Sequence, residues 1–443
     1  MPTIHIRHLE IVTLDAQGTI HHDADLVIRD GKIAHVGAAP PDLAADEVIE
    51  GGGRAAMPGL FNAHCHAPMT FERGWAEDLP FDRWLNEKIW VMESALTPDD
   101  VYWGAALAAC EMIRSGTVGF NDHYFYMDRV AEVVRESGMK AALAWCVFGI
   151  GAEAEVGPGL DGTVEWIKAT HGSAEGRIRT FLGPHSPYVC PSEFLRRVVE
   201  IAHQTGQGIH LHLSESQDQV DQSLARHGLR PTQHVESLGV FDVPGGCVAA
   251  HALYIDQRDT EVLAAKGVHV PHCPITYMKL AMPFPPLEPR LKAGVRVCLG
   301  TDGPASNADM DLFATIRQTA LIHKYQSVDP TQIPGDMALR LATQAGAQAM
   351  GFVGSGVIEV GAPADVILVN LDAPHMRPLH SLVANLVHSA KGADVTDVMV
   401  DGRWLMRNRA LLTLDEERIL AEAERRAQDM VRRGMTQVRE YKG

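Results

Sequence analysis

The middle of this 443-residue chain alternates short apolar runs with amphipathic segments, eight times in succession. A short apolar run bounded by polar residues is typical of a buried strand, and an amphipathic segment is typical of a helix that covers a sheet. Such alternation allows few folds, because each strand must return parallel to the previous one through a crossover. The runs cover residues 55–66, 117–123, 141–149, 178–186, 208–214, 247–253, 268–274 and 295–303.

The order of these units predicts an α/β fold, a (β/α)8 TIM barrel. A doubly wound sheet could alternate in the same way, but no glycine-rich phosphate fingerprint is present. Polar residues follow nearly every run, whereas a doubly wound sheet collects them at one switch point. The barrel is therefore favoured.

Both ends of the chain differ from the middle. Residues 25–36 and 397–406 each place an Asp-Gly turn between apolar stretches, and residues 364–369 form one more apolar run. A lone hairpin is marginally stable in water, so the two ends are expected to pack together as one small β-sandwich domain. The predicted division is residues 1–57 with 363–414 for the small domain, 58–362 for the barrel and 415–443 for a C-terminal helical extension, expected to be a solvated helix.

Charge and cysteine content exclude several functions. With 39 Lys and Arg against 56 Asp and Glu, the net charge of −17 disfavours nucleic acids and anionic membranes as partners. No apolar run approaches the roughly 18–20 residues of a membrane helix, and no secretory signal is visible. Seven scattered cysteines without a C-x-x-C motif predict reduced, buried thiols and a cytoplasmic protein.

A pair of histidines closes the first run, in His64-Cys65-His66. Residues i and i+2 of a strand point to the same side, so both imidazoles could bind one ion. Because the chain has 22 histidines, about one H-x-H is expected by chance, and His210-x-His212 is a second. Position favours a metal site, since the C-terminal ends of barrel strands carry the active sites of such folds.

Later runs also end in polar residues. His212 falls near the end of the fifth run, and Asp302 follows the eighth. A carboxylate after a buried strand is costly unless it is paired or metal-bound. With His64 and His66 these residues form a three-histidine, one-aspartate set with room for a water, the mark of a catalytic metal site.

Two further residues have competing interpretations. Glu215, three residues after His212, could be an acid or base above the metal, or a carboxylate that starts a helix. His251 lies among alanines at the end of the sixth run and could be a hydrogen-bonded core residue. The fourth run ends near His185 without a lysine, so no carbamylated lysine can bridge two ions there, and one metal ion is expected.

The chain resembles the amidohydrolase superfamily and, within it, the methylthioadenosine/S-adenosylhomocysteine deaminase family. The resemblance covers essentially the whole chain. It is most specific in the stretches PGLFNAHCHAPMTFERGWAEDLPFDRWL, GPHSPYVC, HLHLSES and GTDGPASN.

This resemblance implies one divalent ion per subunit, zinc above iron or manganese, on His64, His66, His212 and Asp302. It implies that His251 contacts the hydrolytic water and that Asp302 and His251 take its proton. Glu215 would protonate the purine ring nitrogen and then pass a proton to the departing ammonia. Substrate contacts are expected from Glu93, which would bind the ribose hydroxyls, and from His185, Glu215 and Trp145.

The expected reaction is hydrolytic deamination of a small-molecule nucleoside in purine salvage, by a homo-oligomer. Relatives that accept S-adenosylhomocysteine carry an arginine after the third strand, where residues 144–147 read Ala-Trp-Cys-Val here. Methylthioadenosine, adenosine or 5′-deoxyadenosine is therefore favoured over S-adenosylhomocysteine.

Residues 274–283 also depart from the family pattern, with Thr276, Tyr277 and Pro283. This altered loop leaves open a relative that acts on guanine or an s-triazine. A non-catalytic scaffold on the same barrel is a third reading, although such proteins typically lose ligands that this chain keeps.

Overall fold

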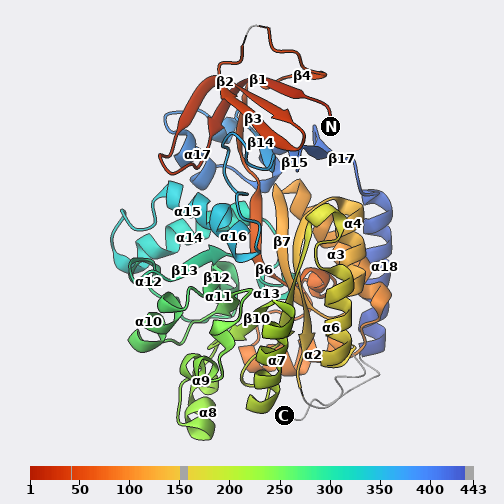
Figure 1. Ribbon diagram of the computed structural model, residues 1–443, viewed down its shortest axis with the longest axis vertical. Helices are drawn as coiled ribbons and strands as arrows, with labels where there is room; N and C mark the ends of the chain where they lie inside the picture. Colours follow the sequence, from red (N-terminus) through yellow and green to blue (C-terminus); the bar gives the residue numbers. More distant parts are fainter. Residues whose placement is uncertain (41, 150–157, 435–443) are drawn as a thin grey trace.

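The computed structural model describes residues 1–40, 42–149 and 158–434. A barrel of parallel strands ringed by helices lies beside a smaller β domain, to which both ends of the chain contribute (Figure 1). The predicted fold class is confirmed.

The barrel sheet contains eight parallel strands in sequential order, from the first at one edge to the last at the other. Every predicted apolar run supplies one of them. The strands are β6 (Leu60–Cys65), β7 (Thr117–Tyr124), β8 (Lys140–Val147), β9 (Ile178–Pro184), β10 (Gly208–Leu213), β11 (Cys247–His251), β12 (His269–His272) and β13 (Arg296–Leu299).

The first predicted run is in fact two strands. Residues 54–58 form β5 (Arg54–Pro58) of the small domain, and the barrel begins with β6 after Gly59. All of residues 55–65 are buried, so the apolar pattern continues across the domain boundary and does not mark it.

The barrel closes between β13 and β6. The Asp302 backbone N–H donates to the His64 carbonyl over 3.0 Å. Beside it, the Asn62 amide donates to the Thr301 hydroxyl over 2.7 Å, and the Thr301 backbone N–H donates to the Asn62 side-chain oxygen over 3.0 Å. These bonds join the first and last strands just below the ends that carry His64 and Asp302.

Helices surround the barrel and cap its openings. The Thr97 side chain and Asp100 form a capping box at the start of α3. The helices of this part are α1 (Phe81–Trp84), α2 (Trp90–Glu93), α3 (Pro98–Arg114), α4 (Met127–Ser137), α6 (Gly159–Thr170), α7 (Ser192–Thr205), α8 (Gln217–His227), α9 (Pro231–Ser237), α10 (Gln257–Ala265), α11 (Pro274–Lys279), α12 (Leu287–Lys292), α13 (Pro304–Asn307), α14 (Leu312–Ser327), α15 (Gly335–Ala342) and α16 (Gln344–Ala349).

The small domain is one nine-stranded sheet around its own apolar core. Strand β5 pairs in parallel with β1 on one side and antiparallel with β14 on the other, which joins the two ends of the chain. Its members are β1 (Ile4–Val12), β2 (Ile20–Arg29), β3 (Lys32–Gly37), β4 (Glu47–Glu50), β5, β14 (Val366–Asn370), β15 (Val395–Val400), β16 (Arg403–Arg407) and β17 (Ala410–Leu411), with the short α17 (Leu382–His388) between β14 and β15.

A buried ion-pair cluster fastens the two domains together. The ammonium of Lys140, at the start of β8, lies 2.6 Å from Asp365 and 2.8 Å from Asp401 of the small domain. Asp365 is fully buried, so its charge depends on this lysine. The contact holds the N-terminal end of the barrel against the small sheet.

The C-terminal helix α18 (Glu416–Gly434) is not a simply solvated helix. Ile419, Ala423 and Met430 are buried, and Arg426 lies 3.6 Å from the buried Asp100 of α3. A narrow apolar stripe among many charges is enough to dock the helix, although composition alone suggests full exposure. Residues 435–443 of the predicted extension lie outside the described residues.

All seven cysteines are free and buried. Among the described residues, no helix is long and apolar enough to cross a lipid bilayer.

Candidate active site

The C-terminal ends of the barrel strands bring five of the predicted residues together. His64 and His66 come from the end of β6, His212 from β10, and His251 from the end of β11. Asp302 follows β13. In a closed parallel barrel these ends meet at one mouth, which explains why residues 238 positions apart share one site.

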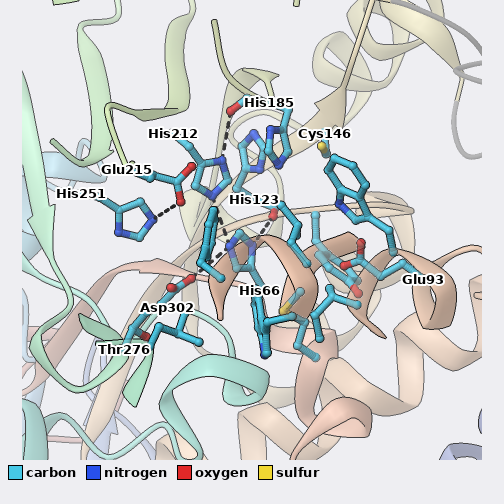
Figure 2. Close-up of a pocket in the computed structure, with 18 of the residues that line it drawn as sticks. His66, Glu93, His123, Cys146, His185, His212, Glu215, His251, Thr276 and Asp302 are labelled. Carbon is cyan, nitrogen blue, oxygen red and sulfur yellow. Dashed lines mark hydrogen bonds and ion pairs between the residues drawn. The ribbon is translucent and has the colours of Figure 1, made fainter. Parts of the chain in front are cut away.

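The ring nitrogens of this group face one another. His66 Nε2 lies 3.3 Å from His212 Nε2 and 3.2 Å from Asp302 Oδ1 (Figure 2). His64 Nε2 lies 3.5 Å from the same Asp302 oxygen. His64 Nε2 is buried without a hydrogen-bond partner. Donor atoms of His64, His66 and His212, and of His64, His251 and Asp302, each lie within 4.8 Å of one another. This donor set fits a divalent metal ion.

The opposite ring nitrogens fix the orientation of the imidazoles. His66 Nδ1 donates to the His123 carbonyl over 2.6 Å, and His212 Nδ1 donates to the His185 carbonyl over 3.0 Å. His64 Nδ1 lies 2.9 Å from His210 Nε2. A ring that donates from Nδ1 to a carbonyl keeps its lone pair on Nε2, as a metal ligand requires.

The site combines imidazoles with one carboxylate. Burial opposes the charged form of His66, but the hydrogen bond and charge of Asp302 raise its pKa to about 9, so a bound cation would displace that proton. Burial and the neighbouring imidazoles hold the pKa of His212 well below its usual range. Burial opposes ionisation of Asp302, yet the close imidazoles of His64 and His66 hold its pKa well below its usual range. A neutral His212 imidazole and an ionised Asp302 carboxylate are the forms of these two groups that bind a cation.

The backbone is strained where two of these residues leave their strands. His251 has a φ of 73° and Asp302 a φ of 63°, both in the left-handed region. Such conformations cost about 1–3 kcal/mol each and tend to occur at functional sites.

Glu215 lies beside the cluster without joining the donor set. Its Oε1 is 3.5 Å from His251 Nε2, and Figure 2 shows the two side chains facing each other. Its backbone N–H donates to Gln219 over 2.9 Å. Burial and the charge of Asp302 raise the pKa of Glu215 to about 7, so the carboxyl can both give and take a proton at neutral pH.

The donor atoms open into a concave pocket at the mouth of the barrel. Aromatic and aliphatic side chains form most of its wall, and among the described lining residues none is lysine or arginine. The apolar part includes Met69, Phe81, Trp84, Leu85, Ile89, Trp90, Phe125, Phe148, Tyr188, Leu280 and Met282.

Three of the four predicted substrate contacts, Glu93, His185 and Glu215, reach this cavity, and Trp145 does not. Glu93 of α2 and His185 line it, and burial raises the pKa of Glu93 to about 7. Figure 2 shows Glu93 across the His66–His212 pair from Glu215 and His251. Trp145 instead packs on Trp166 of α6, with ring centroids 5.2 Å apart. Strand alternation explains this error, because the next residue of β8, Cys146, is the one that lines the cavity.

Other residues at the site were not predicted. His123, at the end of β7, is buried with its ring 5.0 Å from that of His212. The 117–123 run already ended in this histidine, so the signal was present. The altered loop contributes Thr276, Leu280 and Met282 to the wall, whereas Tyr277 lies buried behind His251.

A closed parallel barrel whose C-terminal mouth gathers imidazoles and one carboxylate defines a metal-dependent barrel hydrolase. Residues 55–405 match the model of the Amidohydrolase family, and the chain belongs to that family. The resemblance inferred from its sequence motifs is confirmed.

Known proteins share the whole architecture. The "5-methylthioadenosine/S-adenosylhomocysteine deaminase" of Pelotomaculum thermopropionicum is 42% identical over 436 residues, covering 98% of this chain and 100% of the relative. A solved adenosine deaminase from Xanthomonas campestris with bound zinc aligns with a TM-score of 0.91 and 33% identity over 97% of this chain and 98% of its own. The zinc complex of the atrazine chlorohydrolase TrzN from Arthrobacter aurescens aligns with a TM-score of 0.86 and 25% identity, over 96% of this chain and 100% of its own.

Proposed function

We propose that the protein is a metal-dependent deaminase of adenosine-type nucleosides: 5′-methylthioadenosine, adenosine or 5′-deoxyadenosine. The products are ammonia and the corresponding inosine-type nucleoside. One observation carries the proposal, the buried Glu215 with its pKa of about 7 beside the histidine–aspartate donor set. The names of the Pelotomaculum and Xanthomonas relatives support the same reaction.

The metal would be one zinc ion per subunit, held by His64, His66, His212 and Asp302. When bound, zinc lowers the pKa of a water from about 15.7 to about 7, which supplies an oxygen nucleophile at neutral pH. Bound zinc in the Xanthomonas structure supports the choice of ion. We further propose the predicted domain division at residues 362/363 and 414/415, with the first boundary moved from 57/58 to 58/59 because Pro58 belongs to β5.

The chain's own residues move the protons. Asp302 takes the proton of the attacking water, and Glu215 protonates the ring nitrogen next to the reacting carbon. Asp302, rather than the Glu215 that the family resemblance implies, then gives its proton to the amino group, which leaves as ammonia. The hydroxyl proton returns to Glu215 as the product carbonyl forms, so one water is consumed for each ammonia released.

The cavity wall favours a nucleoside without a charged 5′ group. Glu93 can accept hydrogen bonds from the ribose hydroxyls, and His185, which also lines the cavity, is part of the proposed substrate contact. The described lining offers no cation to pair with the carboxylate of an S-homocysteinyl group, so S-adenosylhomocysteine should be the poorer substrate.

The second candidate is a heterocycle hydrolase that acts on guanine or an s-triazine. Thr276 and Met282 of the altered loop line the cavity and favour it. The deciding experiment compares ammonia release from 5′-methylthioadenosine, adenosine, 5′-deoxyadenosine, S-adenosylhomocysteine, guanine and an amino-s-triazine. Turnover of only guanine or the triazine would refute the nucleoside proposal, and absence of metal in the purified protein would favour a scaffold.

A further inference from the structure

We propose that Tyr277 is a positioning residue that fixes His251 with its ring proton on Nε2, which makes His251 a hydrogen-bond donor and not a base. This role rests on the proposed function, because it concerns the same reaction. Tyr277 belongs to the altered loop and takes no part in the proton transfers assigned to Asp302 and Glu215.

His251 bridges Tyr277 and Glu215 through its two ring nitrogens. The Tyr277 hydroxyl lies 3.4 Å from His251 Nδ1, and Glu215 Oε1 lies 3.5 Å from His251 Nε2. The Nε2 side therefore faces the reacting groups, while the Nδ1 side faces the protein interior. Whatever occupies Nδ1 decides what Nε2 can do.

The surroundings of the phenol set the direction of its hydrogen bond. Glu215 Oε1 faces His251 Nε2, so an acceptor for a ring N–H stands at Nε2, and the lone pair of the neutral ring then lies on Nδ1, opposite the phenol. The Cys273 thiol is adjacent, but burial raises its pKa well above the usual range, and a neutral thiol is a weak acceptor. The imidazole Nδ1 is the stronger acceptor, so the O–H points to His251.

The phenol cannot turn away from this contact. Tyr277 is completely buried, with its ring centroid 5.3 Å from that of His272 and 5.8 Å from that of Phe284. Leu253 completes the cluster around it. A side chain packed on all sides holds its partner in one orientation at little entropic cost.

An imidazole that accepts at Nδ1 carries its proton on Nε2. Without a lone pair there, His251 cannot take the proton of the attacking water, and Asp302 is left as the acceptor. The Nε2–H can instead donate to the oxygen that adds to the ring carbon and stabilise its developing charge. The sequence-based expectation was that Asp302 and His251 both take the proton of the attacking water; here Asp302 alone takes it.

Steady-state kinetics of zinc-loaded Tyr277→Phe test the role. We expect kcat to fall about 10–100-fold with KM within about twofold and zinc content unchanged. The matched control is Tyr254→Phe, a half-buried tyrosine of the same cluster, with unchanged kinetics. In a His251→Ala background, Tyr277→Phe should cause no further loss. An unaffected kcat, or an equal additional loss in that background, would overturn the proposal.

Two measurements do not depend on the folding of that variant. His251→Gln, whose amide N–H can replace Nε2–H, should keep at least about tenfold more activity than His251→Ala. Equal losses of activity in the two variants would contradict the donor role of His251. In protein labelled with 15N-histidine, the His251 signal, identified by its loss in His251→Ala, should show a proton on Nε2, and a bare Nε2 overturns the inference. Because this spectrum needs no turnover, an inactive wild type would refute the proposed function alone.

Discussion

Replacing Glu215 by glutamine tests the proton transfers most directly. The substitution preserves size and hydrogen-bonding capacity at a side chain that is 7% exposed and 3.5 Å from His251 Nε2. It removes only the ability to exchange a proton. Because Glu215 is outside the proposed donor set, zinc content should stay at that of the wild type.

The expected loss follows from the two transfers assigned to Glu215. One general acid–base transfer contributes roughly 10²–10⁴-fold, so kcat of Glu215→Gln should fall by at least about 10³-fold. Burial and the Asp302 charge raise the pKa of Glu215 to about 7. The protonated acid therefore predominates below this pH and disappears above it, so kcat/KM of the wild type should decline as pH rises through about 7.

The assay follows the loss of adenine absorbance, with ammonia measured separately and zinc by elemental analysis. Glu193→Gln, an exposed glutamate in the first turn of α7, is the matched control and should behave as wild type. Turnover of Glu215→Gln at a near-normal rate, with zinc bound, would refute the proton-transfer role.

Four further substitutions probe the site and the frame that supports it. His66→Ala should reduce zinc content to near zero, measured by elemental analysis, and full retention would contradict the ligand assignment. Glu93→Gln should raise KM for nucleosides about 10–100-fold with little effect on folding, the cost of losing hydrogen bonds to a charged group; an unchanged KM would remove Glu93 from the ribose site. Burial and the charge of Glu93 raise the pKa of Glu72 well above its usual value, so the wild type loses stability as pH rises above about 4.3. Glu72→Gln should lack that loss, and its Tm advantage should grow towards alkaline pH; parallel Tm curves would be contrary evidence. Lys140→Met should lower the free energy of unfolding by about 3–5 kcal/mol in urea titrations, because it leaves the buried Asp365 carboxylate without its cation, and a loss under 1 kcal/mol would show that the cluster is unimportant.

The barrel and the proposed metal ligands could be predicted because both depend on local signals. Each strand is a short apolar run, and each ligand stands where a run ends. In a closed parallel barrel, a residue at a strand end needs no further information to be placed at the common mouth. His64 and Asp302 could therefore be placed together because they follow the first and last strands of a barrel that closes on itself.

Side-chain direction could not be predicted in the same way. Every residue of β8 is buried, so its sequence does not show which side chains face the cavity and which face the helices. For this reason Trp145 was expected at the cavity, where Cys146 lies. The aromatic wall from residues 81–90 comes from short helical turns without a clear period. The docking of α18 depends on a partner surface on α3 that no local pattern describes.

The pairing of β5 with β14 has a consequence for how the protein is made. Strands β1 to β5 leave the ribosome first, but the edge of β5 stays unpaired until residue 366 has been synthesised. During that interval the nascent polypeptide carries an open, apolar edge that invites aggregation. Translation of more than 300 residues separates the two partners, so the newborn chain is a natural client for chaperones that shield β edges.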